Sequence, residues 1–167
     1  MRLSPDEFQT IYDQTARPLK AYLVRLVRND ALADELLQET FYKFLRADLE
    51  IDPAKSPKSY LFRIATNLAN DMYRGKREAH VELDEASTAP LAPVQSNDSR
   101  DVERVLNQLK PRERELVWLA YAEGASHREI AEIIGVKEVS VRPMLHRARQ
   151  HLAGLLRSVG FHERMMV

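Results

Sequence analysis

Apolar side chains recur every three or four residues through most of this chain, which is the period of an amphipathic α-helix. Three such runs occupy the first half of the chain and begin near Ser4, Asp30 and Ser56. Pro5 stands at the first helical position after Ser4, and Glu7 completes a capping box with that serine. No segment keeps the alternation of apolar and polar residues that a half-buried strand requires. The pattern therefore predicts an all-α protein.

The three runs differ in the residues that they are expected to bury. Pro18 lies inside the first run and is expected to kink or split that helix. The second run opens at Asp30 and is expected to bury Leu32, Leu36, Phe41, Phe44 and Leu45. The third is expected to extend from Lys58 to Arg74 and to end at Gly75. Its inward face would consist of Tyr60, Leu61, Ile64, Ala65, Leu68 and Met72.

The segment from Ser126 to Leu152 has the residue pattern of a helix-turn-helix. Ser126 and Glu129 form a second capping box, and Gly135 ends the first helix where a positive φ is favourable. The apolar stripe of the second helix is expected to include Val136, Val139, Val141, Leu145, Ala148 and Leu152. An ordinary helical hairpin has a similar pattern, but the basic residues of the second helix favour contact with a DNA major groove.

Pro143 lies where most helix-turn-helix sequences have a helix-forming residue. An interior proline costs a helix about 3 kcal/mol. We therefore expect a late start, with Ser140 as the cap and Pro143 in the first turn. A kink at Pro143 is the alternative. A late start would blunt the front of the helix, where Lys137 and Glu138 lie.

Composition narrows the class of protein without identifying it. The 167 residues are 44% apolar and 30% charged, which is typical of one globular domain or two small ones. No apolar run reaches the roughly 18 residues of a membrane span, and the polar N-terminus is unlike a signal peptide. The chain has no cysteine, so it has no disulfide or thiolate metal site. These features predict a cytoplasmic protein without direct membrane insertion.

The formal net charge of zero conceals an uneven distribution. Residues 1–77 hold 13 basic and 11 acidic side chains, residues 78–101 hold one and six, and residues 102–167 hold 11 and eight. The acidic segment also contains two prolines and three serines and has little apolar periodicity. It is therefore expected to be a flexible linker between two mildly basic helical domains.

Catalysis finds little support in the sequence. The five glycines are dispersed, so none of them forms a phosphate-binding loop. The histidines, including His146 and His151, do not share a helical face at the spacing of metal ligands. No pair of carboxylates stands out among the many. We expect no enzyme activity, no metal and no cofactor.

The third helix carries polar residues on the faces that its apolar stripe leaves free: Arg63, Asn67, Asn70, Asp71 and Arg74, followed by Lys76 and Arg77. Basic side chains bind phosphates and asparagines can hydrogen-bond to base edges. Tyr73, near the end of the helix, could stack on an unpaired base. A solvated helix face with the same composition explains these residues equally well.

Several motifs in this order resemble the extracytoplasmic-function sigma factors of bacterial RNA polymerase. The motifs are ADELLQETF at residues 33–41, SYLFRIATNLANDMYRGKRE at 59–78, LKPRERELVWLAYAEGASHREIAEIIGV at 109–136, and LHRAR at 145–149. The resemblance extends from about Phe8 to Leu156. It implies an alternative, stress- or envelope-responsive sigma factor that binds core polymerase, directs it to promoters and helps to open the DNA.

The resemblance also implies a division of the chain into domains. Residues 1–77 correspond to sigma region 2, residues 78–100 to a linker that threads toward the polymerase active centre, and residues 101–160 to the region 4 helix-turn-helix. Residues 161–167 form a tail. The partners that it implies are core polymerase, promoter DNA and an anti-sigma factor.

The same resemblance assigns candidate contacts in three groups. Core polymerase would bind Asp34, Glu35, Leu37, Gln38 and Phe41. The alternative for Phe41 is that it is mostly buried, and Leu37 is the better exposed apolar contact because it falls off the main stripe. The loop at 48–59 and the helix after it would bind the minus-ten strand through Lys58, Ser59, Arg63, Asn67, Asn70, Arg74, Lys76 and Arg77. The minus-thirty-five duplex would contact Arg112, Arg128, Lys137, Glu138, Ser140, Arg142, His146, Arg147 and Arg149, with Arg114 as a further phosphate candidate.

Two other classes of protein share parts of this pattern. A stand-alone helix-turn-helix regulator would use the N-terminal helices to sense a ligand or to dimerise. A pure interaction module would use the same helices as a protein-binding bundle. A regulator has no need of an exposed Leu37 surrounded by acidic residues, so the surface at residues 34–41 distinguishes the sigma factor from a regulator.

Overall fold

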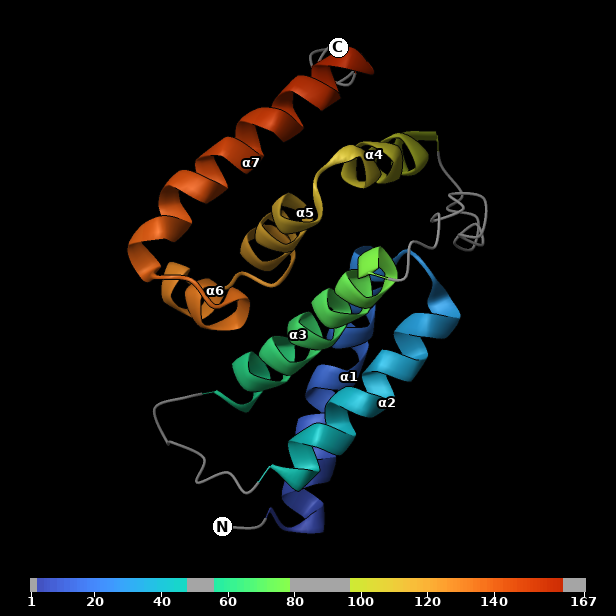
Figure 1. The fold of residues 1–167 in the computed structure, drawn as a ribbon, viewed down its shortest axis with the longest axis vertical. Coiled ribbons are helices and arrows are strands. Elements are labelled where there is room, and N and C mark those ends of the chain that lie inside the picture. The colour runs from blue at the N-terminus through green and yellow to red at the C-terminus, as the bar shows by residue number, and fades with distance from the viewer. Residues whose placement is uncertain (1–2, 48–55, 79–96, 161–167) are drawn as a thin grey trace. The chain divides into compact units, whose positions relative to one another are not determined.

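The computed structural model describes residues 3–47, 56–78 and 97–160, and every regular element in these ranges is a helix (Figure 1). The helices are α1 (Pro5–Val27), α2 (Asp30–Arg46), α3 (Pro57–Glu78), α4 (Asn97–Gln108), α5 (Pro111–Val117), the π-helix η2 (Trp118–Ala122), α6 (His127–Ile134) and α7 (Glu138–Ser158). The all-α prediction is confirmed. None of these helices is long and apolar enough to cross a bilayer.

The chain divides into two compact units. Helices α1, α2 and α3 form the first unit, and each of them packs against the other two. The second unit contains α4, α5, η2, α7 and the start of α6. The expected linker lies mostly outside the described residues. Its last residues are helical, because α4 begins at Asn97, inside the acidic segment 78–101.

Helix α1 begins as its sequence predicts but does not break at its proline. The Ser4 amide donates to the Glu7 carboxylate at 2.8 Å, and the Glu7 amide donates to the Ser4 hydroxyl at 3.2 Å. The helix then continues through Pro18 to Val27, so the expected split is wrong. Thr15 and Leu19, on either side of Pro18, are buried in the first unit. Their packing compensates for the hydrogen bond that a proline removes.

The buried line of α2 differs from the expected one. It consists of Ala33, Leu36, Thr40, Phe41 and Phe44, whereas Leu45 is 54% exposed. Thr40 is fully buried because its hydroxyl donates to the Leu36 carbonyl at 2.6 Å, so its polar group is satisfied within the helix. The buried face of α2 therefore includes Thr40, a polar residue, and leaves out Leu45, which the apolar pattern had placed there.

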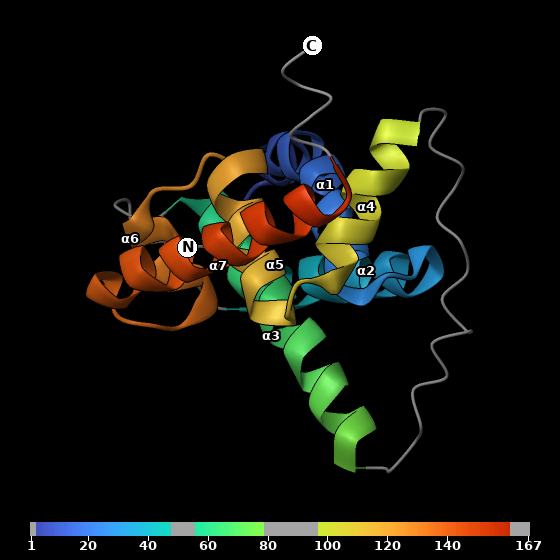
Figure 2. The ribbon, with the colours of Figure 1, turned by 90° about the horizontal axis from the view of Figure 1, so that it is seen from above.

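Helix α3 starts at Pro57 and runs through Gly75 to Glu78, past the expected end. Gly75 does not adopt a left-handed conformation, so nothing ends the helix there. The end of α3 extends past the other two helices of its unit (Figure 2). Its fully buried residues are Leu61, Phe62, Ala65, Thr66 and Ala69, whereas the expected Tyr60, Ile64, Leu68 and Met72 are half-buried.

A buried hydrogen bond joins α1 to α3 in the core of the first unit. The hydroxyl groups of Tyr22 and Thr66 lie 2.8 Å apart, and both side chains are fully buried. The Tyr22 ring also packs on Phe62 at a centroid distance of 5.1 Å. This pair fixes the register of the two helices, because a shift of either would leave a buried hydroxyl without its partner.

Replacing Tyr22 by phenylalanine should destabilise the protein by about 1 kcal/mol, the usual net value of one buried hydrogen bond. Ring packing is retained, so the loss isolates the hydroxyl pair. Urea denaturation followed by circular dichroism measures the change. The control Tyr121→Phe removes a hydroxyl from a tyrosine that is 58% exposed and should leave the curve unchanged. An unaltered curve for Tyr22→Phe would contradict the assigned role.

The second unit is built around α7, against which α4 and α5 pack. The buried apolar residues of this part of the chain include Val105, Leu109, Leu116, Leu119, Ile130, Val141, Leu145 and Ala148. Helix α5 begins at Pro111 and ends at Val117, where the chain continues as the π-helix η2. Trp118, at the start of η2, is half-buried. Gly124 follows with a φ of 62° and ends the segment.

Candidate functional site

The helix-turn-helix formed by α6 and α7 is built on local contacts that its sequence predicts. The Ser126 amide donates to the Glu129 carboxylate at 3.0 Å, and the Glu129 amide donates to the Ser126 hydroxyl at 3.1 Å. Gly135 has a φ of 74°, and the Val136 amide closes the turn on the Ala131 carbonyl at 3.1 Å. The capping box and the glycine turn are therefore confirmed.

The second helix of this motif starts earlier than expected. Lys137 is its N-cap, in an extended conformation, and α7 begins at Glu138. Ser140 lies in the first turn, where its amide donates to the Lys137 carbonyl at 2.9 Å, and Pro143 lies inside the helix. The late start at Ser140 is therefore wrong, and Lys137 and Glu138 stand at the front of the helix.

Packing on one side of α7 explains why the proline does not move the start of the helix. Val141 is fully buried and Leu145 is 4% exposed, so this face is held by the core of the second unit. Pro143 lies on the exposed side. Val139 is exposed as well, at 80%, which corrects its expected place in the buried stripe. Two residues advance a helix by about 200°, so Val139 and Val141 cannot face the same way.

Exposed polar and basic side chains gather on the helix-turn-helix and on α5. Ser140 is half-buried, and the other residues expected at the duplex are exposed: Arg112, Arg128, Lys137, Glu138, Arg142, His146, Arg147 and Arg149. Arg112 also forms an ion pair at 3.4 Å with buried Glu115. Arg114 is only 8% exposed, so its expected phosphate contact is wrong.

A hydrogen bond between Glu113 of α5 and His151 of α7 supports the same surface. The Glu113 carboxylate lies 2.5 Å from Nδ1 of His151, and both groups remain partly exposed. Together with the buried residues of α7, this contact holds the long helix against α5. The exposed basic face of α7 is thus presented from a fixed helix rather than from a loop.

The capping box at Ser126 gives a direct test of how much the motif depends on its first helix. Ser126→Ala should lower the stability of the second unit by about 1 kcal/mol, because the Glu129 amide loses the serine hydroxyl as its acceptor. Thermal unfolding measures this loss. The matched control is Ser158→Ala, at the far end of α7, where no N-terminal cap is lost. Equal melting curves for the two variants would contradict the assignment.

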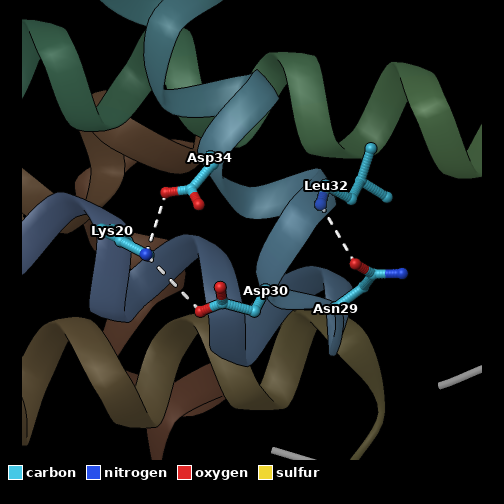
Figure 3. Close-up of polar contacts among 5 residues, drawn as sticks. All are labelled: Lys20, Asn29, Asp30, Leu32 and Asp34. Atoms are coloured by element: carbon cyan, nitrogen blue, oxygen red, sulfur yellow. Dashed lines mark hydrogen bonds and ion pairs between the residues drawn. The ribbon is translucent and has the colours of Figure 1, made fainter. Parts of the chain in front are cut away.

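The first unit presents a second candidate surface on α2, beginning with an ion-pair cluster. Nζ of Lys20, on α1, lies 2.9 Å from the Asp34 carboxylate and 3.5 Å from that of Asp30 (Figure 3). The hydrogen bond to Asp34 raises the pKa of Lys20 above its ordinary value, against the opposing effect of desolvation. The Asn29 side chain caps the same helix by accepting from the Leu32 amide at 3.0 Å.

The residues expected to bind a partner through α2 fall into two groups. Glu35 and Gln38 are exposed, and Asp34 and Leu37 are half-buried. Phe41 is only 6% exposed, with its ring 4.9 Å from that of Tyr12 and 6.0 Å from that of Phe8. Of the two roles expected of Phe41, burial is the one observed: its ring packs α2 against α1.

A third candidate surface lies along α3. Arg63, Asn67, Asn70 and Arg74 are spaced by three or four residues and so share one side of the helix; Asn70 is half-buried and the others are exposed. Lys58 and Ser59 are half-buried at the start of α3, and Nζ of Lys58 lies 5.8 Å from the centre of the Phe62 ring. Lys76 and Arg77 belong to α3, but their side chains, like the loop at 48–55, lie outside the described part of the chain.

The two tyrosines of α3 are held by the first unit. The Tyr73 hydroxyl donates to the Leu26 carbonyl of α1. Tyr60 is half-buried, with its ring 6.1 Å from that of Phe44. Tyr73 is therefore anchored to α1, which corrects the suggestion that it is free to stack on a base.

Comparisons with known proteins agree with this division into two units. The family model described as Sigma-70 region 2 matches residues 11–79, and the one described as Sigma-70, region 4 matches residues 99–152. The chain is 35% identical over 158 residues to RNA polymerase sigma factor CarQ of Myxococcus xanthus, covering 90% of each protein. It is 31% identical to ECF RNA polymerase sigma factor EcfG of Rhodopseudomonas palustris, covering 83% of this chain and 78% of that protein. The chain belongs to the ECF sigma factors.

Two solved structures share the fold of this sigma factor. RpoE from Bartonella quintana, solved in complex with the anti-sigma factor NepR, is 26% identical with a TM-score of 0.74 and covers 90% of this chain and 96% of its own. CnrH, solved with the cytosolic domain of CnrY, is 26% identical with a TM-score of 0.70, and the match covers 93% of this chain and 90% of CnrH.

The family gives the two units their names and their function. Region 2 holds the α2 and α3 surfaces, and region 4 holds the helix-turn-helix. The protein is an alternative sigma factor of RNA polymerase, and thus belongs to a regulatory, non-catalytic family. Sequence reasoning missed the role of Lys20 beside Asp34, because a pairing between separate helices leaves no local pattern.

Proposed function

We propose that this ECF sigma factor docks on core polymerase through α2, holds the unpaired minus-ten strand along α3, and reads the minus-thirty-five duplex with α7. It acts in the cytoplasm. The observation that carries the proposal is the α2 surface, because a self-sufficient DNA-binding protein has no need of it. There Leu37 is half-buried between exposed Glu35 and Gln38.

The chemistry of the α2 surface suits a protein partner. Leu37 offers an apolar group that can be desolvated, and Glu35 and Gln38 offer a charge and an amide for hydrogen bonds around it. Lys20 holds the Asp34 carboxylate at 2.9 Å, so that this acid is oriented before a partner arrives. An oriented surface loses less side-chain entropy on binding. Phe41 supports this surface from below by packing on α1.

The α3 surface suits a single strand of DNA. The exposed guanidinium groups of Arg63 and Arg74 can bind phosphates, and the amides of Asn67 and Asn70 between them can hydrogen-bond to base edges. Extruding a base from the stack costs a few kcal/mol, which contacts of this kind offset. The surface requires strand separation and therefore fits a step that follows docking on polymerase.

The α7 surface suits duplex DNA. Exposed Arg142, Arg147 and Arg149 supply positive charge along one helix, and the helix N-terminus at Lys137 and Glu138 adds backbone N–H groups. A helix presented in this way from a helix-turn-helix enters the major groove. Arg112 and Arg128 lie on the preceding helices and add candidate phosphate contacts.

Regulation by an anti-sigma protein completes the proposal. The structure of RpoE was solved in complex with the anti-sigma factor NepR, and that protein shares the fold of this chain. An anti-sigma factor that covers the α2 surface would keep the sigma factor from core polymerase. A stress or envelope signal that removes it would release a dissociable initiation factor.

Equilibrium titration tests this function against that of a stand-alone regulator. Fluorescently labelled sigma factor is titrated with purified bacterial core polymerase, and separately with promoter duplex in the absence of polymerase. We expect saturable binding to core polymerase and only weak, salt-sensitive binding of the monomer to duplex. Tight duplex binding as a dimer, without binding to core polymerase, would instead identify a self-sufficient regulator.

A further inference from the structure

Val139 is the most exposed large apolar side chain among the described residues, at 80%. Single exposed apolar residues are common on protein surfaces and need no explanation by themselves. Val139, however, lies in the first turn of α7, at the end of the helix that a helix-turn-helix directs into a major groove. An apolar group in that place changes what the helix can recognise.

Val139 does not stand alone on its face of the helix. Arg142, Pro143 and His146 follow it at intervals of three, four and seven residues, and all of them are exposed. The opposite side, with Val141 and Leu145, is buried in region 4. Val139 and Pro143 are thus one turn apart and form a short apolar strip within a basic face.

The charge around this strip favours nucleic acid as its partner. From Lys137 to Arg149, α7 and its cap contain four lysines and arginines and one acid, Glu138. A neutral or acidic protein could bind the same charges, but the front of the second helix is the part of this motif that meets base edges. Within the major groove, the apolar group on a base edge is the C5-methyl of thymine.

We infer that Val139, with Pro143 behind it, reads the C5-methyl group of a thymine in the duplex bound by region 4. This inference rests on the proposed function of α7. Arg142 and His146 stand beside the strip and supply polar contacts to neighbouring bases or phosphates. Val139 is then a specificity-determining residue whose contribution does not depend on charge.

Deoxyuridine provides the test, because it differs from thymine only by the missing methyl group. Holoenzyme made from the full chain and core polymerase first selects its preferred upstream duplex from a random pool. Each thymine of the selected element is then replaced in turn by deoxyuridine, and binding is measured for wild-type, Val139→Ala and Val139→Thr holoenzymes. The control Val102→Ala makes the same change at a valine of α4 that is 37% exposed.

At one or two positions, deoxyuridine should weaken wild-type binding by about fourfold, the effect of removing one buried methyl group. Val139→Ala should bind the thymine duplex about fourfold more weakly and show no further loss with deoxyuridine. Val139→Thr, which keeps a methyl group, should retain the preference. Val102→Ala should behave as wild type.

The results separate this inference from the function on which it rests. Equal deoxyuridine losses in wild type and Val139→Ala, or a selected element without thymine, would overturn the methyl contact and leave promoter reading intact. A holoenzyme that selects no upstream sequence would overturn both. A Val139→Ala variant that loses binding equally on all duplexes would show a structural role and would also overturn the inference.

Discussion

Replacing Leu37 and Gln38 together by alanine weakens the binding of core polymerase by about 30-fold or more in an equilibrium titration. The expected size follows from the value of about 2 kcal/mol for truncating a central interface residue, since 1.4 kcal/mol corresponds to a tenfold change. Leu37 is half-buried and Gln38 is exposed, so neither change empties the core of region 2. Circular dichroism should therefore give the helical spectrum of the wild type.

A matched pair in region 4 serves as the control for this experiment. Leu106 and Gln108 are a half-buried leucine and an exposed glutamine on α4, outside the three proposed surfaces. Their joint replacement by alanine should leave core binding within about twofold of wild type, as surface changes usually do. Unchanged affinity of the Leu37 and Gln38 variant would remove α2 from the polymerase interface.

Arg142→Ala should weaken binding of holoenzyme to its minus-thirty-five element by between about fivefold and 150-fold, the range expected for losing one bidentate contact to a base. Arg142 is exposed one turn after the start of α7, on the face that carries Val139. If it reads a base, the variant also loses discrimination at one position. If Arg142 binds only a phosphate, discrimination between bases is retained. The slope of the logarithm of the binding constant against the logarithm of the salt concentration then falls by about one unit.

Arg157 offers a control on the same helix. It is exposed in the last turn of α7, far from the helix front, and its replacement by alanine removes the same charge. Arg157→Ala should bind the element as the wild type does. Equal losses for Arg142→Ala and Arg157→Ala would mean that α7 contributes only general positive charge, and the base-reading role of its front would be wrong.

Features that depend on neighbouring residues were predictable from the sequence. The capping boxes at Ser4 and Ser126 and the turn at Gly135 are local, because every contact that forms them lies within five residues. The helical period that they delimit is equally local, and the all-α fold follows from it. Gly75 shows where such local prediction fails, because a glycine ends a helix only where it adopts a left-handed conformation, and Gly75 does not.

Features that depend on packing between helices were less predictable. Thr40 and Leu45 lie on neighbouring lines of α2, and only the position of α1 and α3 decides which line is buried. A polar residue occupies that line because its hydroxyl is satisfied by its own helix. The same problem affected the candidate site. Arg114 is buried and Val139 is exposed, although the residue type of each favours the opposite.

The proposed surfaces follow from this combination of local and tertiary structure. The sequence motifs locate α2, α3 and α7, but exposure decides which side chains on each helix can reach a partner. Leu37 and Gln38 remain available on α2, Arg63 and Asn67 on α3, and Arg142 on α7. Their contacts with polymerase and DNA are predictions that substitution can test one surface at a time.

Runoff transcription from a linear promoter template tests the central claim most directly. Purified core polymerase is supplied with the full chain, and the template carries the element selected by the holoenzyme. We expect a product of defined length only when both proteins are present, and none from the Leu37 and Gln38 double variant at limiting concentration. A product without this chain, or no product with it although the chain binds the promoter by itself, would contradict the account.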